Sequence, residues 1–209
     1  MDAKPSSDIA FTPSVKAMQV RRGSREAYAK IEARGGFKTK ITPDLIAFLT
    51  EVDTAYLATA NAAGQPYVQH RGGPKGFICS LDETTLGFAD YAGNRQYITL
   101  GNLAENDQAF LFLMDYAHRR RVKIWGRARI VEADPELISR LMPADYRAHA
   151  EQAILFDVKA WDVNCHHIPQ KLDAGEVAEV LAKLRSRIET LEAENDKLRA
   201  ATHRSSGHC

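Results

Sequence analysis

The spacing of apolar residues changes twice along the chain, and it predicts a helical beginning, a strand-rich middle and a helical end. Near the start, "TPSVKAMQV" places Thr12 as a cap before Pro13, and "SREAYAKIEA" keeps its apolar residues in helical register. We therefore expect residues 1–40 to form an ordered helical arm. "TPDLIAFLTEV" repeats the Thr-Pro start at Thr42 and predicts a further short helix.

From Asp53 onward the apolar residues alternate with polar ones, which is the period of a strand. "TAYLATAN" and "QPYVQHR" predict a hairpin around Gly64, and "GFICSL" and "TLGFADY" flank an acidic turn. "AFLFLMD" and "AILFDVKAWDV" predict further apolar strands. The alternation in "RRVKIWGRARIV" predicts one side formed by Val122, Ile124, Gly126, Ala128 and Ile130, and another formed by Lys123, Trp125, Arg127 and Arg129.

Two helical patterns interrupt these strands. One covers "NRQYITLGNLAEN", from Asn94 to Asn106 with an Asn cap, and the other covers "DPELISRLM", where Asp134 caps Pro135. The remaining segments give six or seven antiparallel strands at hairpin spacing. A small closed or partly closed β-barrel suits them best, because closure removes exposed strand edges. The expected fold class is therefore mainly β with helices (α+β), with the barrel over residues 41–172.

The tail has a heptad pattern. In its helical frame, apolar residues repeat at d positions, and a second set follows four residues later at a positions. Arg187 would face Glu192 of a parallel partner, and Glu194 would face Arg199. We expect residues 174–200 to form a coiled-coil helix and residues 201–209 a disordered tail, the alternative being an amphipathic helix laid on its own domain. The seam consists of Val177, Leu181, Leu184, Ile188, Leu191, Asn195 and Leu198.

Net charge, the length of apolar runs and the cysteine count indicate which partners and which cellular compartment to expect. The net charge of +1 gives no electrostatic reason to expect a nucleic-acid or membrane partner. No apolar run approaches the roughly 20 residues of a spanning helix, and "MDAKPSSDIA" lacks a hydrophobic leader segment. Cys79, Cys165 and Cys209 are odd in number and far apart, which argues against a disulfide framework. We expect a cytoplasmic protein with no nucleic-acid and no membrane partner.

The stretch "QHRGGPKGFI" is the first candidate for chemistry. It lacks the spacing of a triphosphate P-loop, of a dinucleotide fingerprint and of a nucleophile elbow. Arg71 ends a predicted strand, and Gly72 and Gly73 then offer backbone that a flat or phosphorylated ligand could approach closely. A glycine-rich hairpin with a surface arginine is the competing interpretation.

The stretch "FADYAGNRQYITLGNLAEN" is the second candidate. It ends a strand, turns at Gly93 and places Asn94, Arg95 and Gln96 in the first turn of the expected helix. The amides at a helix start carry partial positive charge and suit a phosphate, and an arginine adds a bidentate donor. Because a cation in that turn opposes the helix dipole, we expect an anion to compensate Arg95.

Taken together, "GQPYVQHRGG", "LGFADYAGNRQYITLGNLAENDQAFLFLMD" and "RRRVKIWGRARIV" resemble the pyridoxamine 5′-phosphate oxidase-related flavoproteins, which are FMN-binding split β-barrels. The resemblance covers roughly Leu45 to Val131, and "FTPSVKAMQVRRGSREAY" is similar to a bacterial branch of that superfamily. It implies an antiparallel split β-barrel that binds FMN at a homodimer interface.

The resemblance also implies roles for particular residues. Arg71 would contact the flavin phosphate, and the backbone from His70 to Gly73 would run beside the isoalloxazine ring. Arg95 and Gln96 would grip the phosphate, although Gln96 stands where the family has a lysine. The full set of implied cofactor-binding residues is His70, Arg71, Gly72, Gly73, Asp90, Tyr91, Asn94, Arg95, Gln96 and Arg121.

The end of the predicted barrel departs from the oxidases proper. Trp161 is followed by "DVNCHHIPQKLDAG" and not by the Arg-x-His ending that holds pyridoxal phosphate in that family, so we do not expect vitamin B6 oxidation. Cys165, His166 and His167 are adjacent, which is poor geometry for one tetrahedral metal ion, and no metal site is expected. Haem bound through a histidine remains an alternative.

The favoured expectation is a homodimeric FMN-dependent oxidoreductase that acts on a small-molecule substrate, with a reduced nicotinamide or a reduced deazaflavin as a possible electron donor. No side chain stands out as an obligate acid or base, so no catalytic residue is assigned. The alternatives are a non-enzymatic haem- or flavin-binding split barrel, and a coiled-coil adaptor in which the barrel is only a scaffold.

Overall fold

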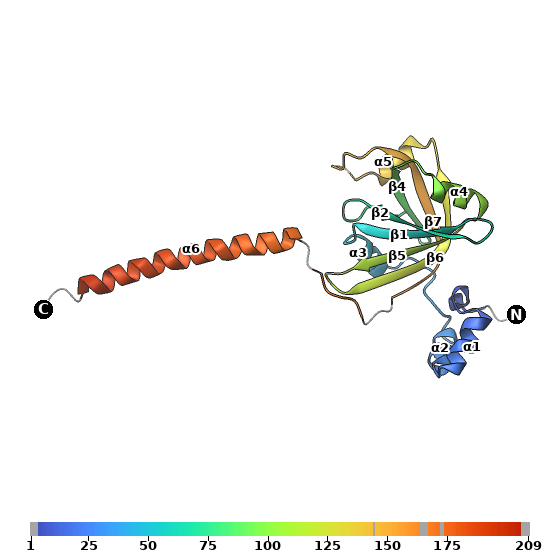
Figure 1. Ribbon diagram of the computed structural model, residues 1–209, viewed down its shortest axis with the longest axis horizontal. Helices are drawn as coiled ribbons and strands as arrows, with labels where there is room; N and C mark the ends of the chain where they lie inside the picture. The colour runs from blue at the N-terminus through green and yellow to red at the C-terminus, as the bar shows by residue number, and fades with distance from the viewer. Residues whose placement is uncertain (1–3, 144, 164–166, 172–173, 206–209) are drawn as a thin grey trace. The chain divides into compact units, whose positions relative to one another are not determined.

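The computed structural model describes residues 4–143, 145–163, 167–171 and 174–205. The chain divides into two compact units (Figure 1). The first runs from Met1 to Asp115 and from Arg119 to Ile168, and it holds the helical arm and the sheet. The second joins residues 116–118 to the segment from Pro169 onward. Cys165 and His166 lie outside the described residues, whereas His167 is described and exposed.

The amino-terminal arm contains η1 (Ser6–Ile9), α1 (Pro13–Arg21) and α2 (Arg25–Glu32). Thr12 caps α1 as the sequence predicts, because its side chain accepts a hydrogen bond from the backbone amide of Val15. The arm is fastened to the sheet through Phe37, whose ring stacks on Trp125 with ring centres 5.3 Å apart. Phe11 packs edge-on against Phe37, with ring centres 5.2 Å apart. The arm is therefore held to the sheet by aromatic contacts.

The described part of the chain forms a seven-stranded antiparallel sheet in the order β2-β1-β5-β6-β7-β4-β3 (Figure 1). This confirms the expected antiparallel split-barrel architecture of the α+β class, although the sheet is not closed by backbone pairing. The elements of this unit are α3 (Pro43–Leu49), β1 (Thr54–Ala60), β2 (Pro66–Gly72), β3 (Cys79–Ser80), β4 (Thr85–Tyr91), α4 (Ile98–Glu105), β5 (Gln108–Asp115), β6 (Arg120–Val131), α5 (Pro135–Leu141) and β7 (Ala150–Asp162).

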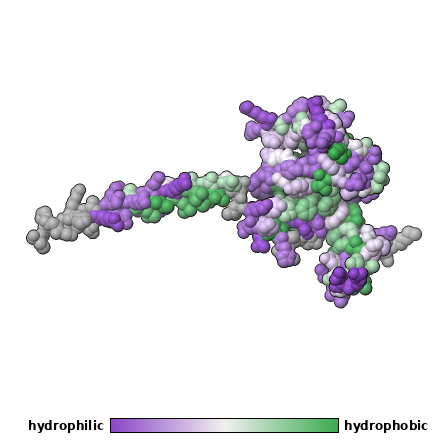
Figure 2. Space-filling view, viewed as in Figure 1, coloured by the Kyte–Doolittle hydropathy of each residue, from purple (hydrophilic) through white to green (hydrophobic). Residues whose placement is uncertain are grey.

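The core lies on the concave side of the sheet and follows the predicted alternation. On β6, Val122, Ile124 and Ala128 are buried, whereas Lys123 and Trp125 lie on the opposite side. The core is completed by the buried face of α3 and by the inward residues of β1, β4, β5 and β7. Hydrophobic surface is sparse over most of the sheet unit in Figure 2. Most apolar residues of the strands are thus buried in the core.

Two predicted boundaries differ from the structure. The helix expected from Asn94 to Asn106 begins only at Ile98 and ends at Glu105, and Tyr97, not Asn94, occupies its cap position. The side chain of Asn94 instead accepts a hydrogen bond from the backbone amide of Gln96, which stabilises a local turn. The strand expected over "GFICSL" is reduced to the two residues of β3.

The second unit is dominated by α6 (Ala174–Ser205). This helix continues past residue 200, where the disordered tail was expected to begin, and residues 206–209 lie outside the described residues. Among the described residues, no helix combines the length and the apolar character that crossing a membrane requires.

Candidate functional site

A chain of polar side chains crosses the opening between the two ends of the sheet. Arg71 on β2 donates from one Nη to Asp90 of β4, with 2.7 Å between Nη1 and Oδ1. Its other Nη donates to Gln69 at 3.1 Å. Gln69 and Arg71 are two residues apart on one strand, so both side chains leave the same face. Because β2 and β4 are not backbone neighbours, this ion pair joins parts of the sheet that hydrogen-bonded pairing leaves apart.

Two further side chains extend this network on either side. Thr99 at the start of α4 donates its hydroxyl to Gln69 at 2.8 Å, and Gln152 on β7 donates its amide to Asp90 at 2.8 Å. Thr99, Asp90 and Gln152 are all buried. Buried polar groups that are mutually hydrogen-bonded hold a fixed geometry, because breaking one bond leaves a desolvated partner.

Helix α4 is fixed beside this network by a second buried contact. Asn102 donates from its side-chain amide to the hydroxyl of Thr59 on β1 at 3.0 Å. The segment that leads into the helix contains two residues with left-handed backbone, Arg95 (φ 58°) and Tyr97 (φ 52°). Such a conformation costs a non-glycine residue of order 1–3 kcal/mol and is concentrated at binding sites. This turn leads directly into the helix start, where Thr99 bonds to Gln69 of the network.

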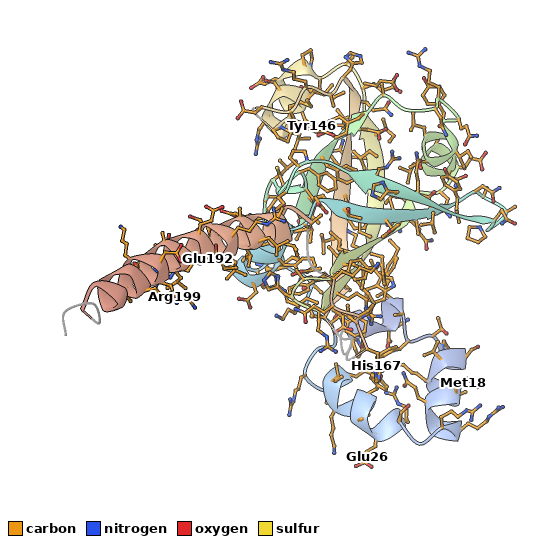
Figure 3. All side chains as sticks on the ribbon, turned by 60° about the vertical axis from the view of Figure 1, so that its left-hand side comes forward. Met18, Glu26, Tyr146, His167, Glu192 and Arg199 are labelled. Atoms are coloured by element: carbon orange, nitrogen blue, oxygen red, sulfur yellow. The ribbon has the colours of Figure 1, made fainter. Side chains whose placement is uncertain are left out.

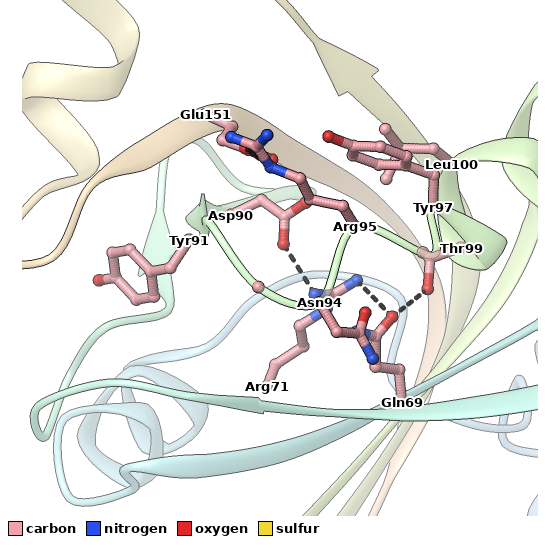
Figure 4. A pocket seen from close by; sticks show the side chains of 11 residues that line it. Gln69, Arg71, Asp90, Tyr91, Asn94, Arg95, Tyr97, Thr99, Leu100 and Glu151 are labelled. Carbon is pink, nitrogen blue, oxygen red and sulfur yellow. Dashed lines mark hydrogen bonds and ion pairs between the residues drawn. The ribbon is translucent and has the colours of Figure 1, made fainter.

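A cavity of about 40 Å³ lies between the network and the start of α4 (Figure 4). By the usual volume of an enclosed water it has room for about three water molecules. A flavin ring requires several hundred Å³. The space in one chain therefore suits a group of the size of a phosphate. It is lined by Gln69, Arg71, Asp90, Tyr91, Gly93, Asn94, Arg95, Tyr97, Thr99, Leu100 and Glu151.

The charges around this cavity are balanced in the isolated chain. Arg71 is neutralised by Asp90, and Arg95 lies 3.7 Å from Glu151, measured from Nε to Oε1. The two pairs differ in strength, because the first is buried whereas the side chain of Arg95 is 71% exposed. An exposed pair is worth about 0–1 kcal/mol, so Arg95 can exchange Glu151 for another anion at little cost. Arg71 Nε is buried and has no hydrogen-bond partner among the described residues, which leaves one donor available.

The structure brings together half of the residues that the sequence assigned to the cofactor. Arg71, Asp90, Tyr91, Asn94 and Arg95 all line the cavity. The arginine expected to hold a phosphate by its charge is, however, already engaged by Asp90. Sequence reasoning missed the other lining residues: Gln69, Gly93, Tyr97, Thr99, Leu100 and Glu151. Gln69 could have been found, because a residue two positions before Arg71 on a strand must share its face.

The remaining five assigned residues do not line this cavity. His70 leaves the opposite face of β2 and packs against Tyr56, with ring centres 5.7 Å apart. A Cβ on Gly72 would lie 2.8 Å from His70 Cε1, and a Cβ on Gly73 would lie 2.8 Å from Phe77 Cβ. Packing within the chain therefore requires a glycine at residue 73, because the inner atoms of Phe77 cannot move away, whereas the ring end of the exposed His70 can move away from Gly72. For Gly73 this is a different reason from the close ligand approach that we expected. The others are Gln96, which is exposed, and Arg121, which lies over the Phe112 ring.

Tyr91 forms the wall of the cavity on the side of α5. Its ring packs against Tyr146, with ring centres 5.2 Å apart. Burial, followed by the neighbouring Tyr146 and Cys79, raises the pKa of the Tyr91 phenol above its ordinary value. The phenol is therefore a neutral hydrogen-bond donor at physiological pH. Among the described residues, no cluster of histidine, cysteine and carboxylate side chains has the arrangement of a metal site.

The curled antiparallel sheet and the polar cavity beside α4 define a split-barrel protein. Residues 41–171 match the model of the family described as pyridoxamine 5′-phosphate oxidase, and the chain belongs to this FMN-binding family. The resemblance seen in the sequence is thereby confirmed. No curated protein matches the chain significantly.

Solved structures similar to this chain come from several bacteria. One is HupZ of Group A Streptococcus, in a form that carries a single substitution, with 20% identity, 59% of this chain and 99% of that chain covered, and a TM-score of 0.46. A second is described as a putative pyridoxamine 5′-phosphate oxidase from Lactobacillus delbrueckii, with 22% identity, coverage of 60% and 95%, and a TM-score of 0.45. A third is an FMN-binding protein from Syntrophomonas wolfei, with 11% identity, coverage of 76% and 99%, and a TM-score of 0.44.

Proposed function

We propose that this protein is an FMN-dependent oxidoreductase in which the flavin phosphate binds beside the start of α4 and the ring lies between two subunits. Membership of the FMN-binding family supports the cofactor. The observation that carries the location is that Arg71, Arg95 and the first turn of α4, with Thr99 and Leu100, line one cavity. These donors suit a dianionic phosphate, because helix-start amides and guanidinium groups both favour negative charge.

Arg95 would supply the charge in this site. Its weak pair with Glu151 can open, and the guanidinium can then turn to the phosphate. Arg71 would remain paired with Asp90 and contribute only its unpartnered Nε. Thr99 adds a hydroxyl near the helix start. The residues present therefore fit the phosphate end of the cofactor, and the bound flavin would supply the transfer of electrons.

The size of the cavity supports a second subunit. The cavity that one chain forms here is open to solvent and measures about 40 Å³, far below the several hundred Å³ of a site that covers a molecule of this size. A partner surface must therefore cover the ring if water is to be excluded from it. A homodimer provides this surface without another protein.

The absorption spectrum of the purified protein is the first test. Flavin bands that bleach on addition of a reduced nicotinamide, and that return when a small-molecule acceptor is added afterwards, would support the proposal. A colourless protein that binds no added FMN in a fluorescence titration would contradict it. A Soret band that weakens in His166→Ala or His167→Ala would instead favour the haem-binding alternative.

The role of Arg95 has its own test. Arg95→Ala should weaken FMN binding by about 1.5–3 kcal/mol, or roughly ten- to a hundredfold, because a charge-assisted hydrogen bond is lost. Glu151→Gln should leave the affinity equal or higher, because the competing carboxylate is gone. Arg127→Ala serves as the matched control, since Arg127 is an exposed arginine paired with Asp107. If Arg95→Ala binds FMN like Arg127→Ala, the phosphate does not lie beside Arg95.

A further inference from the structure

Helix α6 presents a continuous apolar stripe to solvent. All six apolar members of the heptad seam remain between 37% and 69% exposed in the described chain. Figure 2 shows hydrophobic residues gathered along one edge of the helix. A long helix with one apolar stripe needs a partner for it, because exposed apolar area of this extent is unfavourable in water. The apolar members are Val177, Leu181, Leu184, Ile188, Leu191 and Leu198.

We propose that α6 forms a parallel, in-register, two-stranded coiled coil with α6 of a second copy of this chain. The seam alternates steps of four and three residues, which is the spacing that keeps one stripe facing a partner helix along its length. Three of its four d positions carry leucine, which favours two strands. The outer face is suited to water: Glu179 and Lys183, at f and c positions, form an ion pair 3.3 Å long.

Asn195 fixes the orientation of this pair. It is the one polar residue of the seam, and it occupies an a position. In a parallel, in-register pair it meets Asn195 of the partner subunit, and the two amides can hydrogen-bond to each other. In an antiparallel pair it would meet an apolar d residue, which leaves a buried amide without a partner at a cost of about 1–3 kcal/mol. Asn195 therefore favours the parallel arrangement.

The charges beside the seam agree with the same register. Arg187 and Glu194 lie at g positions, and they would face Glu192 and Arg199 at the e positions of the partner helix. Both pairs bring opposite charges together. Residues five apart on one helix point about 140° away from each other, so these pairs cannot form within a single α6. Figure 3 shows Glu192 and Arg199 projecting from the helix.

Disulfide trapping in the full-length chain tests the register. In a Cys209→Ser background, Asn195→Cys places two thiols face to face across the seam, and we expect near-complete covalent dimer under mild oxidation. Ser186→Cys, at an outward f position, is the matched control and should remain monomeric on a non-reducing gel. Equal cross-linking of the two variants, or none in Asn195→Cys, would overturn the proposal. The second outcome is also the one expected of an antiparallel pair or of a helix laid on its own domain.

Charge reversal tests the choice of partner. A variant with Arg187→Glu and Arg199→Glu makes both facing pairs acidic, and one with Glu192→Lys and Glu194→Lys makes both basic. When these two proteins are refolded together in the Asn195→Cys background, mixed disulfide dimers should exceed their statistical share. A statistical mixture would contradict the proposal. Neither test involves the cofactor, so failure here would leave flavin binding unaffected.

Discussion

Replacing Arg71 by methionine would leave the carboxylate of Asp90 buried without its charged partner. The side chains of this pair are only 12% and 8% exposed, so solvent cannot compensate for the loss. Breaking one side of a buried ion pair costs about 3–5 kcal/mol. Gln152 still donates to Asp90, so we expect a value near the lower end. For a protein of this size, a loss of about 3 kcal/mol lowers the melting temperature by roughly 6–12 °C.

The same substitution at an exposed pair is the control. Arg127 and Asp107 form an ion pair of nearly the same length, 2.8 Å, but with side chains 55% and 46% exposed. Arg127→Met should therefore change the free energy of unfolding by only about 0–1 kcal/mol. Comparison of the two variants isolates burial as the cause, because residue types and distance are matched.

Urea unfolding followed by tryptophan fluorescence would measure both effects, since Trp161 is buried against the core. Adding Asp90→Asn to Arg71→Met removes the unpaired buried carboxylate, so the double variant should recover much of the lost stability. The reasoning would be refuted if Arg71→Met were no more destabilising than Arg127→Met. It would equally fail if the double variant were as unstable as Arg71→Met alone.

Three further substitutions probe the barrel, helix α4 and the wall of the cavity. Gly126→Ala should destabilise the fold by at least about 1–3 kcal/mol, because its Cβ would lie 2.2 Å from the backbone oxygen of Asp157. Gly101→Ala in α4, where nothing lies within 4 Å of the added atom, should be neutral or stabilising in the same urea experiment. The raised pKa of Tyr91 predicts that stability falls as pH rises above about 10, because the unfolded phenol then ionises more readily than the folded one. Tyr91→Phe should remove that part of the alkaline decline, and an unchanged pH profile would contradict the assignment.

Local patterns in the sequence were sufficient to predict most of the fold. The alternation on β6 predicted its buried side because a strand has only two faces. The caps at Thr12, Thr42 and Asp134 were found because each accepts the hydrogen bond that its residue type favours. These features depend on neighbours in sequence, which is why they could be predicted.

The start of α4 shows where such reasoning stops. Asn94 is a good cap, and the amide of Gln96 does bond to it, but the helix begins only after Tyr97. The intervening turn requires left-handed backbone at Arg95 and Tyr97. Residues of these types rarely adopt that conformation, so no local preference predicts it. The packing of α4 places the helix there, through Asn102 with Thr59 on β1 and through Thr99 with Gln69 on β2.

The ion pair between Arg71 and Asp90 could not be predicted for a different reason. The two residues come from strands that are separated in the sheet, and they meet only because the sheet curls. Position within each strand indicated which face they occupy, but not that they would neutralise each other. The sequence therefore identified both as site residues, but it could not predict the ion pair that joins them.

Because Arg71 both bonds to Asp90 across the sheet and lines the cavity, the proposed phosphate site would link ligand binding to barrel stability. A phosphate that accepts a hydrogen bond from Arg71 Nε satisfies a buried donor that is unpartnered among the described residues. The bound state then gains stability that the unfolded chain cannot share, and the gain grows with the logarithm of ligand concentration. The same linkage explains why Arg71 is a poor position at which to test cofactor binding. A loss of affinity in Arg71→Met would combine the missing contact with a loosened barrel, whereas Arg95, exposed and weakly paired, reports on the contact alone.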